Sequence, residues 1–360
     1  MNRIPVGILG ATGTVGQRFI LIMTNHPWFE VTAVAASDRS AGRRYDEACH
    51  WLLRTEMPGA AGRLPVEALE PGLDCQLVFS ALPSSVAGPV EEEFARAGYA
   101  VCSNAAPFRM AADVPLLIPE VNAGHSALIE TQRANRRWSG LISTSANCTT
   151  TQLALALKPL QDAFGLLKVS VVSMQAVSGA GFPGVPSMDI LGNVVPYIGG
   201  EEEKVESESL KLLGSLRDGE IVSSQCIISA QCNRVPVRDG HLECVSLEFE
   251  RNPEVEEVVA ALKGFRASPE VADLPSSPEL PILVRQEPDR PQPMRDRDAG
   301  GGMSIVVGRV RACPVLDVKL VVLGHNTVRG AAGGSIHNAE LLVAQGWVRC
   351  LSMRRLCSRC

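Results

Sequence analysis

Long apolar runs and blocks of one charge are missing from this chain, and its first residues predict no secretion leader. No apolar stretch among its 360 residues approaches the roughly 20 residues that a membrane-spanning helix needs. The first residues, MNRIPVGILGATG, lack the charged head, apolar stretch and cleavage site of a secretion leader. Acidic and basic residues are mixed along a chain of net charge −5, and no Lys/Arg block indicates a nucleic acid or an anionic membrane as partner. The sequence therefore predicts a globular, cytoplasmic protein.

The chain has eleven cysteines, an odd number that cannot all pair within one chain, and we expect no leader that would direct it to an oxidising compartment. We therefore expect no disulfide framework. Cys357 and Cys360 form a C-x-x-C pair, but no second pair and no nearby histidine completes a metal or redox site. The sequence predicts no metal site and favours a frayed tail at this end.

The first half of the chain alternates short apolar runs with helical patterns. Residues 4–9, 31–36, 75–82 and 99–103 predict buried strands, and apolar residues recur at helical spacing from 15 to 23. Strands that alternate with helices indicate parallel βαβ units.

The pattern changes in the second half. Residues 169–177, 242–250, 304–312 and 316–323 predict strands, and the second of these alternates apolar with polar side chains. Strands with one polar face are typical of an antiparallel or mixed sheet. Residues 331–345 predict a late helix.

A glycine-rich segment, GATGTVG, occupies residues 10–16, where the first strand ends and the first helix begins. Glycines at this place let the backbone approach a pyrophosphate, and the helix N-terminus supplies oriented N–H donors. The spacing is G-x-x-G-x-x-G rather than G-x-G-x-x-G, and a plain tight turn is the alternative. We predict a dinucleotide-binding loop that uses Gly10, Thr12, Gly13, Thr14, Val15 and Gly16.

The residues after the second strand indicate which dinucleotide is bound. An acid there accepts the ribose 2′-hydroxyl of NAD, whereas a basic residue accommodates the 2′-phosphate of NADP. Arg39, with the hydroxyls of Ser37 and Ser40, favours NADP. Asp38 argues for NAD unless it points into solvent. The balance favours NADP.

Cys148 is a candidate nucleophile. It lies in STSANCTTTQ, directly before apolar residues at helical spacing, so it is expected at a helix N-terminus. The helix dipole and free N–H groups there favour a thiolate and can stabilise an oxyanion on a carbonyl substrate. A small buried cysteine is the alternative, and the local sequence alone does not separate the two.

The segment Ser145-Ala146-Asn147-Cys148-Thr149-Thr150 resembles the nucleophile motif of aspartate-semialdehyde dehydrogenases, and the resemblance extends over nearly the whole chain. It is closer to the archaeal and fungal branch of that family than to the typical bacterial one. The other matching segments are GATGTVGQRF at 10–19, SALPSSVAG at 80–88, SNAAPFRM at 103–110, VSGAGFPGVPSMDILGNVVPYIGGEEEKVE at 177–206, NRVPVRDGHLECVSL at 233–247 and LGHNTVRGAAGGSI at 323–336.

The resemblance implies an α/β protein with two domains. Residues 1–147 and 330–360 would form a Rossmann-like domain that binds NADP. Residues 148–329 would form an α+β catalytic and dimerisation domain with a mixed sheet. It also implies a homodimer or homotetramer. The further cofactor contacts that it implies are Ser80, Ser178, Gly179, Gly181 and Asn326.

The implied reaction is the NADPH-dependent reductive dephosphorylation of L-aspartyl 4-phosphate to L-aspartate 4-semialdehyde. It belongs to the biosynthesis of lysine, threonine, methionine and isoleucine. Cys148 would attack the acyl carbon, expel phosphate and form a thioester. His241 is implied as the general base, for which an ordinary histidine pKa of about 6.5 would be suitable. Gln175 is implied to orient the acyl intermediate, although an ordinary strand glutamine is the alternative.

The resemblance also assigns the substrate contacts. Arg234 would clamp the substrate α-carboxylate, because a planar guanidinium fits a carboxylate with two hydrogen bonds. Arg238 is nearer to His241 but is interpreted as a solvated arginine. Arg109 would bind phosphate, and Asn147 joins the substrate contacts.

Glu208 and Lys211 complete the implied substrate set, on the ammonium group and near the phosphate. They are three residues apart and so share one helical face. Glu206 and Lys204 are the alternative pair.

Three rival functions remain open. A CoA-dependent malonyl-semialdehyde-type reductase on the same fold would keep Cys148 and His241 but not the amino-acid contacts. A non-catalytic NADP-binding protein would have lost part of the set Cys148, Gln175, Arg234 and His241. An N-acyl-glutamyl-phosphate reductase would share the chemistry but not the long matching segments.

Overall fold

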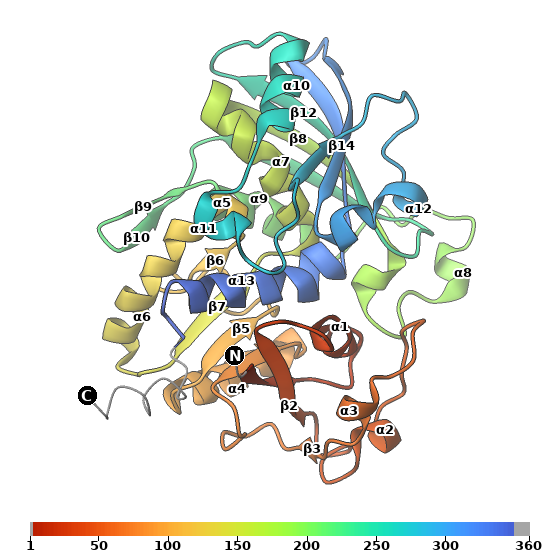
Figure 1. Ribbon diagram of the computed structural model, residues 1–360. Helices are drawn as coiled ribbons and strands as arrows, with labels where there is room; N and C mark the ends of the chain where they lie inside the picture. Colours follow the sequence, from red (N-terminus) through yellow and green to blue (C-terminus); the bar gives the residue numbers. More distant parts are fainter. Residues whose placement is uncertain (1–2, 349–360) are drawn as a thin grey trace. The chain divides into compact units, whose positions relative to one another are not determined.

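The computed structural model describes residues 3–348, which fold into two compact units (Figure 1). Of the described residues, unit 1 contains 3–115, 126–145 and 335–348, and unit 2 contains 116–125 and 146–334. The Cys357/Cys360 pair lies outside the described residues. No helix among those described is long and apolar enough to cross a membrane.

Unit 1 is built on a parallel sheet. Its strands lie in the order β3-β2-β1-β4-β5-β7, and each pairs in parallel with its neighbours. Nearly all their side chains are buried, as expected for parallel strands covered on both faces. The strands are β1 (Ile4–Leu9), β2 (Phe29–Ala35), β3 (Val66–Glu67), β4 (Leu77–Ser80), β5 (Ala100–Ser103) and β7 (Leu141–Ser145).

The helices of unit 1 connect these strands, and together they enclose an apolar core around Leu9, Val78, Phe94 and Val101. The helices are α1 (Thr14–Met23), α2 (Tyr45–Ala48), α3 (Gly59–Gly62), α4 (Ser84–Arg96) and α6 (Leu128–Arg136). The late helix α13 (Gly333–Ala344) also belongs to unit 1 from Ser335 onward.

Unit 2 contains a mixed sheet in the order β11-β8-β12-β15-β14-β13. The outer pairs β11/β8 and β13/β14 are parallel, and the inner pairs are antiparallel. The predicted fold class, a Rossmann-like unit plus a unit with a mixed sheet, is confirmed. The strands are β8 (Leu166–Gln175), β11 (Ile227–Arg234), β12 (His241–Phe249), β13 (Ile282–Val284), β14 (Ile305–Ala312) and β15 (Val318–Gly324).

Helices α7 (Cys148–Phe164), α9 (Glu201–Leu212) and α10 (Val255–Gly264) pack against one face of this sheet. Every second strand residue, such as Val245 and Leu247, is buried against them. The shorter elements of unit 2 are β6 (Leu116–Leu117), α5 (Pro119–Asn122), η2 (Val177–Ala180), α8 (Ser187–Ile190), β9 (Ser215–Arg217), β10 (Glu220–Val222), α11 (Pro269–Ala272), α12 (Pro293–Asp296), η3 (Ala299–Gly302) and η4 (Val328–Ala332). A 3₁₀ turn, η1 (Ala123–Ala127), spans the boundary of the units.

Candidate active site

The glycine-rich loop of unit 1 has the shape that a dinucleotide phosphate requires. Gly10 has φ +78°, and a Cβ at Gly16 would lie 2.4 Å from the carbonyl oxygen of Gly10. Larger residues at either place would therefore deform the loop. Gly13 is the N-cap of α1, so no side chain caps the first N–H groups of the helix. The buried Oγ1 of Thr14 has no hydrogen-bond partner among the described residues, which fits an anionic ligand at this helix N-terminus.

The residues after β2 and β4 lie in the same unit. Ser37, Asp38 and Arg39 are exposed, and Ser40 begins to turn the chain through a backbone hydrogen bond from its N–H to the Ser37 carbonyl. Ser80 ends β4 beside the last residue of β1 and is fully buried. Asp38 is exposed to solvent, which is the condition under which it does not argue for NAD.

Arg109 also belongs to unit 1. Its side chain is largely buried, and one terminal nitrogen donates to the carbonyl oxygen of Asn104 at 2.6 Å. A buried guanidinium that is anchored at one end suits the recognition of an anion.

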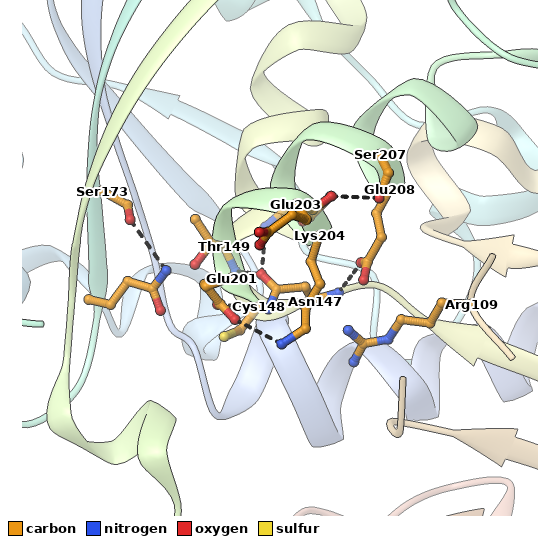
Figure 2. A network of polar contacts seen from close by, with 12 residues as sticks. Arg109, Asn147, Cys148, Thr149, Ser173, Glu201, Glu203, Lys204, Ser207 and Glu208 are labelled. Carbon is orange, nitrogen blue, oxygen red and sulfur yellow. Dashed lines mark hydrogen bonds and ion pairs between the residues drawn. The ribbon is translucent and has the colours of Figure 1, made fainter. Parts of the chain in front are cut away.

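Cys148 is the first residue of α7 in unit 2, as its local sequence predicts. Asn147 is the N-cap, and its side-chain oxygen accepts from the N–H groups of Thr149 and Thr150 at 2.9 and 3.2 Å (Figure 2). Its amide nitrogen donates to Glu201 at 2.8 Å. The side chain of Asn147 is therefore used in fixing the helix start that carries Cys148.

His241, the first residue of β12, is fully buried, and its Nε2 lies 3.2 Å from the Sγ of Cys148. Its Nδ1 accepts a hydrogen bond from the backbone N–H of Ala176 at 3.0 Å. The neutral ring therefore carries its proton on Nε2 and directs it at the sulfur.

Burial, together with the charges of Arg234 and His325, lowers the pKa of His241 to about 3. The expectation of an ordinary pKa is therefore wrong for this ring, because the charged form has lost its hydration. His241 is neutral at physiological pH.

Arg234 and Gln175 lie opposite each other on the paired strands β11 and β8. Both are buried, and Arg234 donates to the carbonyl oxygen of Ala176 at 2.9 Å. Burial lowers the pKa of Arg234, while the negative charge of Cys148 opposes that change. The Gln175 amide donates to the Ser173 hydroxyl at 3.3 Å. The backbone of Ala176 thus links the two side chains: its carbonyl oxygen accepts from Arg234, and its N–H donates to His241.

The predicted cofactor contacts of unit 2 lie next to this group. A Cβ at Gly179 would lie 2.9 Å from the Arg234 guanidinium and 3.0 Å from the His241 ring, so glycine is needed there. Asn326 donates to the Ser178 hydroxyl at 2.8 Å and accepts from the N–H of Gly240, also at 2.8 Å. Gly181 ends the same turn with φ +72°. Asn326 therefore ties the 178–181 turn to the residue before His241.

Helix α9 turns Glu208 and Lys211 inward. Both are buried, and Glu208 accepts a hydrogen bond from the backbone N–H of Asn147 at 2.6 Å (Figure 2). Glu206 instead accepts from the N–H of Ala230 on the edge strand β11, and Lys204 contacts Glu201 at 3.3 Å. The geometry favours Glu208 over Glu206 as the group beside Cys148.

Two contributors could not be identified from the sequence alone. Ala176 acts through its backbone, which leaves no side-chain signal. Glu201 is one of three consecutive glutamates, but it lies seven residues before Glu208, a spacing that places both on one face of a helix. Arg238 is exposed and pairs with Asp239, as a solvated arginine should.

Unit 2 thus brings a thiol at a helix N-terminus together with a neutral histidine that points its N–H at the sulfur. A buried arginine, a buried glutamine and a buried carboxylate lie around them. This set is suited to covalent catalysis on an acyl group, because the donors favour a thiolate and an oxyanion.

Comparison with known proteins gives the same picture. Residues 5–129 match the semialdehyde dehydrogenase NAD-binding domain, and residues 157–329 match the semialdehyde dehydrogenase dimerisation domain. The chain is 54% identical over 344 residues to an aspartate-semialdehyde dehydrogenase of Archaeoglobus fulgidus, covering 95% of this chain and 99% of the relative. It is 46% identical over 352 residues to that of Schizosaccharomyces pombe, covering 95% and 98%.

A solved structure agrees. The crystal structure of aspartate semialdehyde dehydrogenase with NADP from Candida albicans matches with a TM-score of 0.88 and 43% identity, covering 96% of this chain and all of that chain. The archaeal and fungal resemblance predicted from the motifs is confirmed. The chain belongs to the aspartate-semialdehyde dehydrogenase family, oxidoreductases that act on an aldehyde group.

Proposed function

We propose that this protein catalyses the NADP-dependent reductive dephosphorylation of L-aspartyl 4-phosphate to L-aspartate 4-semialdehyde through a thioester on Cys148. The product would supply the biosynthesis of lysine, threonine, methionine and isoleucine. One observation carries the proposal: Cys148 begins α7 and has the Nε2 of a buried histidine 3.2 Å from its sulfur.

The first step is acyl transfer to Cys148. The thiolate attacks the acyl carbon, a C–S bond forms, and phosphate leaves with the electron pair of the C–O bond and takes up a proton. The positive end of the α7 dipole stabilises the thiolate, and the proposed role of Gln175 is to donate to the oxygen that becomes negative in the tetrahedral state. Phosphate release leaves a thioester on Cys148.

NADP is the proposed cofactor, and the residues present fit it. The Gly10–Gly16 loop with the open first turn of α1 suits the pyrophosphate, and Arg39 with Ser37 and Ser40 suits the 2′-phosphate. When bound, NADPH supplies the hydride that brings the thioester to the aldehyde level. Release of the semialdehyde returns the C–S electron pair to Cys148.

His241 acts in this proposal as a hydrogen-bond donor. Because its Nδ1 is held by the Ala176 N–H, the neutral ring offers Nε2–H and has no free lone pair for a proton. It stabilises the Cys148 thiolate before attack and the substrate oxygen afterwards. This role differs from the general base implied by the family resemblance.

Amino-acid recognition separates this function from a CoA-dependent reductase. Arg234 is proposed to bind the substrate α-carboxylate, Glu208 the ammonium group, and Lys211 and Arg109 the phosphate. Burial of Arg234 supports its assignment, because a buried guanidinium suits a carboxylate partner shielded from water. A CoA thioester would offer no ammonium group to Glu208.

The protein is also proposed to form a homo-oligomer through the open face of the mixed sheet. Residues that alternate with the core residues include Val172 and Ile227, which are 37% and 64% exposed. Polar side chains such as Ser170 and Ser246 share this face, and a mixture of exposed apolar and polar residues is typical of a subunit interface. Sedimentation equilibrium tests this, and a monomer at micromolar concentration would contradict it.

The steady-state test follows NADPH formation from L-aspartate 4-semialdehyde, phosphate and NADP. We expect phosphate-dependent turnover that Cys148→Ala abolishes and that the control Cys226→Ala, at another cysteine of unit 2, retains. NAD in place of NADP measures the cofactor preference. Turnover with an acyl-CoA but not with semialdehyde and phosphate would replace this function by the reductase.

A further inference from the structure

A buried carboxyl lies two residues after His241 and has no part in the proposed chemistry. Glu243 is fully buried on β12, on the same side of the strand as His241, because alternate strand residues share a face. Gln152 is fully enclosed on α7, four residues after Cys148 and so on the same helical face. Helix α7 thus carries Cys148 and the buried Gln152, and strand β12 carries His241 and the buried Glu243.

These two neighbours are in direct contact. The Gln152 amide nitrogen donates to the backbone oxygen of His241 at 3.0 Å and to a carboxyl oxygen of Glu243 at 2.6 Å. Gln152, which lies on the same helix as Cys148, therefore contacts both the backbone of His241 and the side chain of Glu243. We propose that Gln152 and a protonated Glu243 form a positioning pair that sets His241 against Cys148.

The space for this pair is provided by a glycine. Gly324 of β15 pairs with His241, and a Cβ there would lie 2.2 Å from the Gln152 side-chain oxygen. Any larger residue at 324 would displace the amide. The contact between α7 and β12 therefore depends on Gln152, Glu243 and Gly324, none of which takes part in the proposed chemistry.

The surroundings of Glu243 explain why it is neutral. Gln152 faces it from α7, Ser173 stands opposite it on β8, and Val322 pairs with it on β15. From β11 it meets the Cys232 thiol, whose pKa is raised to about 11 by burial, with the nearby acidic groups adding to the shift. Cys244 follows it on its own strand.

Within residues 3–348 no ion pair reaches Glu243, and its second oxygen has no hydrogen-bond partner. Burial accordingly raises the pKa of Glu243 well above its usual range. An ionised carboxylate here would lack a counter-charge, so the protonated acid is the stable form.

The function of the pair is geometric. The N–H of Ala176 holds the ring of His241 at Nδ1, and Gln152 holds its backbone. Besides the contact of Cys148 with His241 itself, the bonds of Gln152 are the side-chain hydrogen bonds that join α7 to β12 among the described residues. A displacement of about 1 Å between reacting groups can lower a rate by about a hundredfold.

The experiment compares Glu243→Gln, Glu243→Ala and Gln152→Ala in the full-length protein. Glu243→Gln keeps a neutral acceptor for Gln152, so we expect its kcat within about threefold of wild type. We expect each alanine variant to lower kcat by about 10- to 100-fold, with the KM for the semialdehyde within about twofold. The double alanine variant should cost no more than the larger single loss, because the two residues act as a unit.

A second readout does not need turnover, although the kcat measurements rest on the proposed function. The rate of Cys148 alkylation by iodoacetamide, followed against pH without substrate, reports the alignment of His241 with the thiol. We expect the alanine variants to alter this pH profile and Glu243→Gln to retain it. Glu91→Ala is the matched control, because it removes another buried carboxyl of raised pKa in unit 1.

Three results would overturn the positioning pair. The first is a loss in Glu243→Gln as large as that in Glu243→Ala, which would mean that an ionised carboxylate is needed. The second is an alanine variant with normal kcat but raised KM. The third is an unchanged alkylation profile in Gln152→Ala, which decides the matter even if Glu243→Ala does not fold. Inactive wild-type protein with a normal alkylation profile would instead count against the proposed reaction.

Discussion

At the scale of single residues, the reactivity of Cys148 is set by groups that touch it or its helix start. His241 directs an N–H at the sulfur, and Asn147 fixes the first turn of α7 through two backbone N–H groups. A third neighbour, Gly330, contacts Cys148 itself: a Cβ there would lie 2.7 Å from the Cys148 Cβ and 2.9 Å from its Cα. The thiol therefore has little freedom to shift.

We expect Gly330→Ala to lower kcat by at least about tenfold, because the new methyl group must displace the nucleophile. Overpacking of this kind should also cost about 1–3 kcal/mol in the free energy of unfolding. Enzyme assays and urea denaturation measure the two effects. Gly264→Ala is the control, since nothing lies within 4 Å of a Cβ at that position. Normal kcat in Gly330→Ala would mean that the thiol is less confined than the contacts indicate.

At the scale of elements, α9 uses its faces for different tasks. Glu202 and Glu206 accept from the N–H groups of Cys232 and Ala230 on β11, the edge strand of the mixed sheet. Glu208 turns toward Asn147. One charged run therefore both covers a strand edge and contributes to the active site.

This division predicts opposite results for two neighbouring glutamates. Glu208→Gln should raise the KM for the semialdehyde by about tenfold or more, because it removes the charge proposed to bind the ammonium group. Glu206→Gln should leave KM within about twofold, since an amide oxygen still accepts from Ala230. Kinetics with varied semialdehyde measure both. A raised KM in Glu206→Gln alone would favour the Glu206/Lys204 pair.

The elements that the sequence predicts well are those with strong periodicity. β1 matches its predicted bounds, and α1, α7 and β12 begin within a residue or two of theirs. β11 was not predicted, because an edge strand such as IISAQCNR exposes Ser229 and Gln231 and shows no clear apolar alternation. The short strand β13, with three residues, is too brief for any period.

The candidate site likewise has residues that the sequence predicts and features that only the folded structure shows. Motifs indicated Cys148, His241 and Arg234, and the structure brings these three together. The low pKa of His241, the backbone contacts of Ala176 and the Gln152–Glu243 pair depend on burial and on strand pairing between distant segments. No local pattern in the sequence encodes them.

At the scale of the whole molecule, buried neutral histidines link stability to pH. Burial lowers the pKa of His125 to about 4, against its ordinary value of about 6.5. Between these values the unfolded chain binds a proton that the folded chain does not. Stability is therefore lost as pH falls from about 6.5 toward 4, by up to about 1.4 kcal/mol per pH unit for this group. Glu243 and Glu91, whose pKa values are raised, act in the opposite sense.

Comparing wild type with His125→Gln separates the contribution of His125 to the pH dependence of stability from the contributions of Glu243 and Glu91. The variant lacks the titrating group, so its stability relative to wild type should improve steadily as pH falls from about 6.5 to 4. Urea denaturation at a series of pH values measures the difference. A difference that stays constant with pH would show that His125 is not held neutral by burial.

The most direct test of the central claim, a thioester on Cys148, is a rapid-mixing experiment without phosphate. Semialdehyde and NADP should give a burst of about one NADPH per active site and then stop, because no acceptor removes the acyl group. Addition of phosphate should restart turnover, and a tryptic digest of the stalled enzyme should carry the acyl group on the Cys148 peptide. A burst that persists in Cys148→Ala, or an acyl group found elsewhere, would contradict the account.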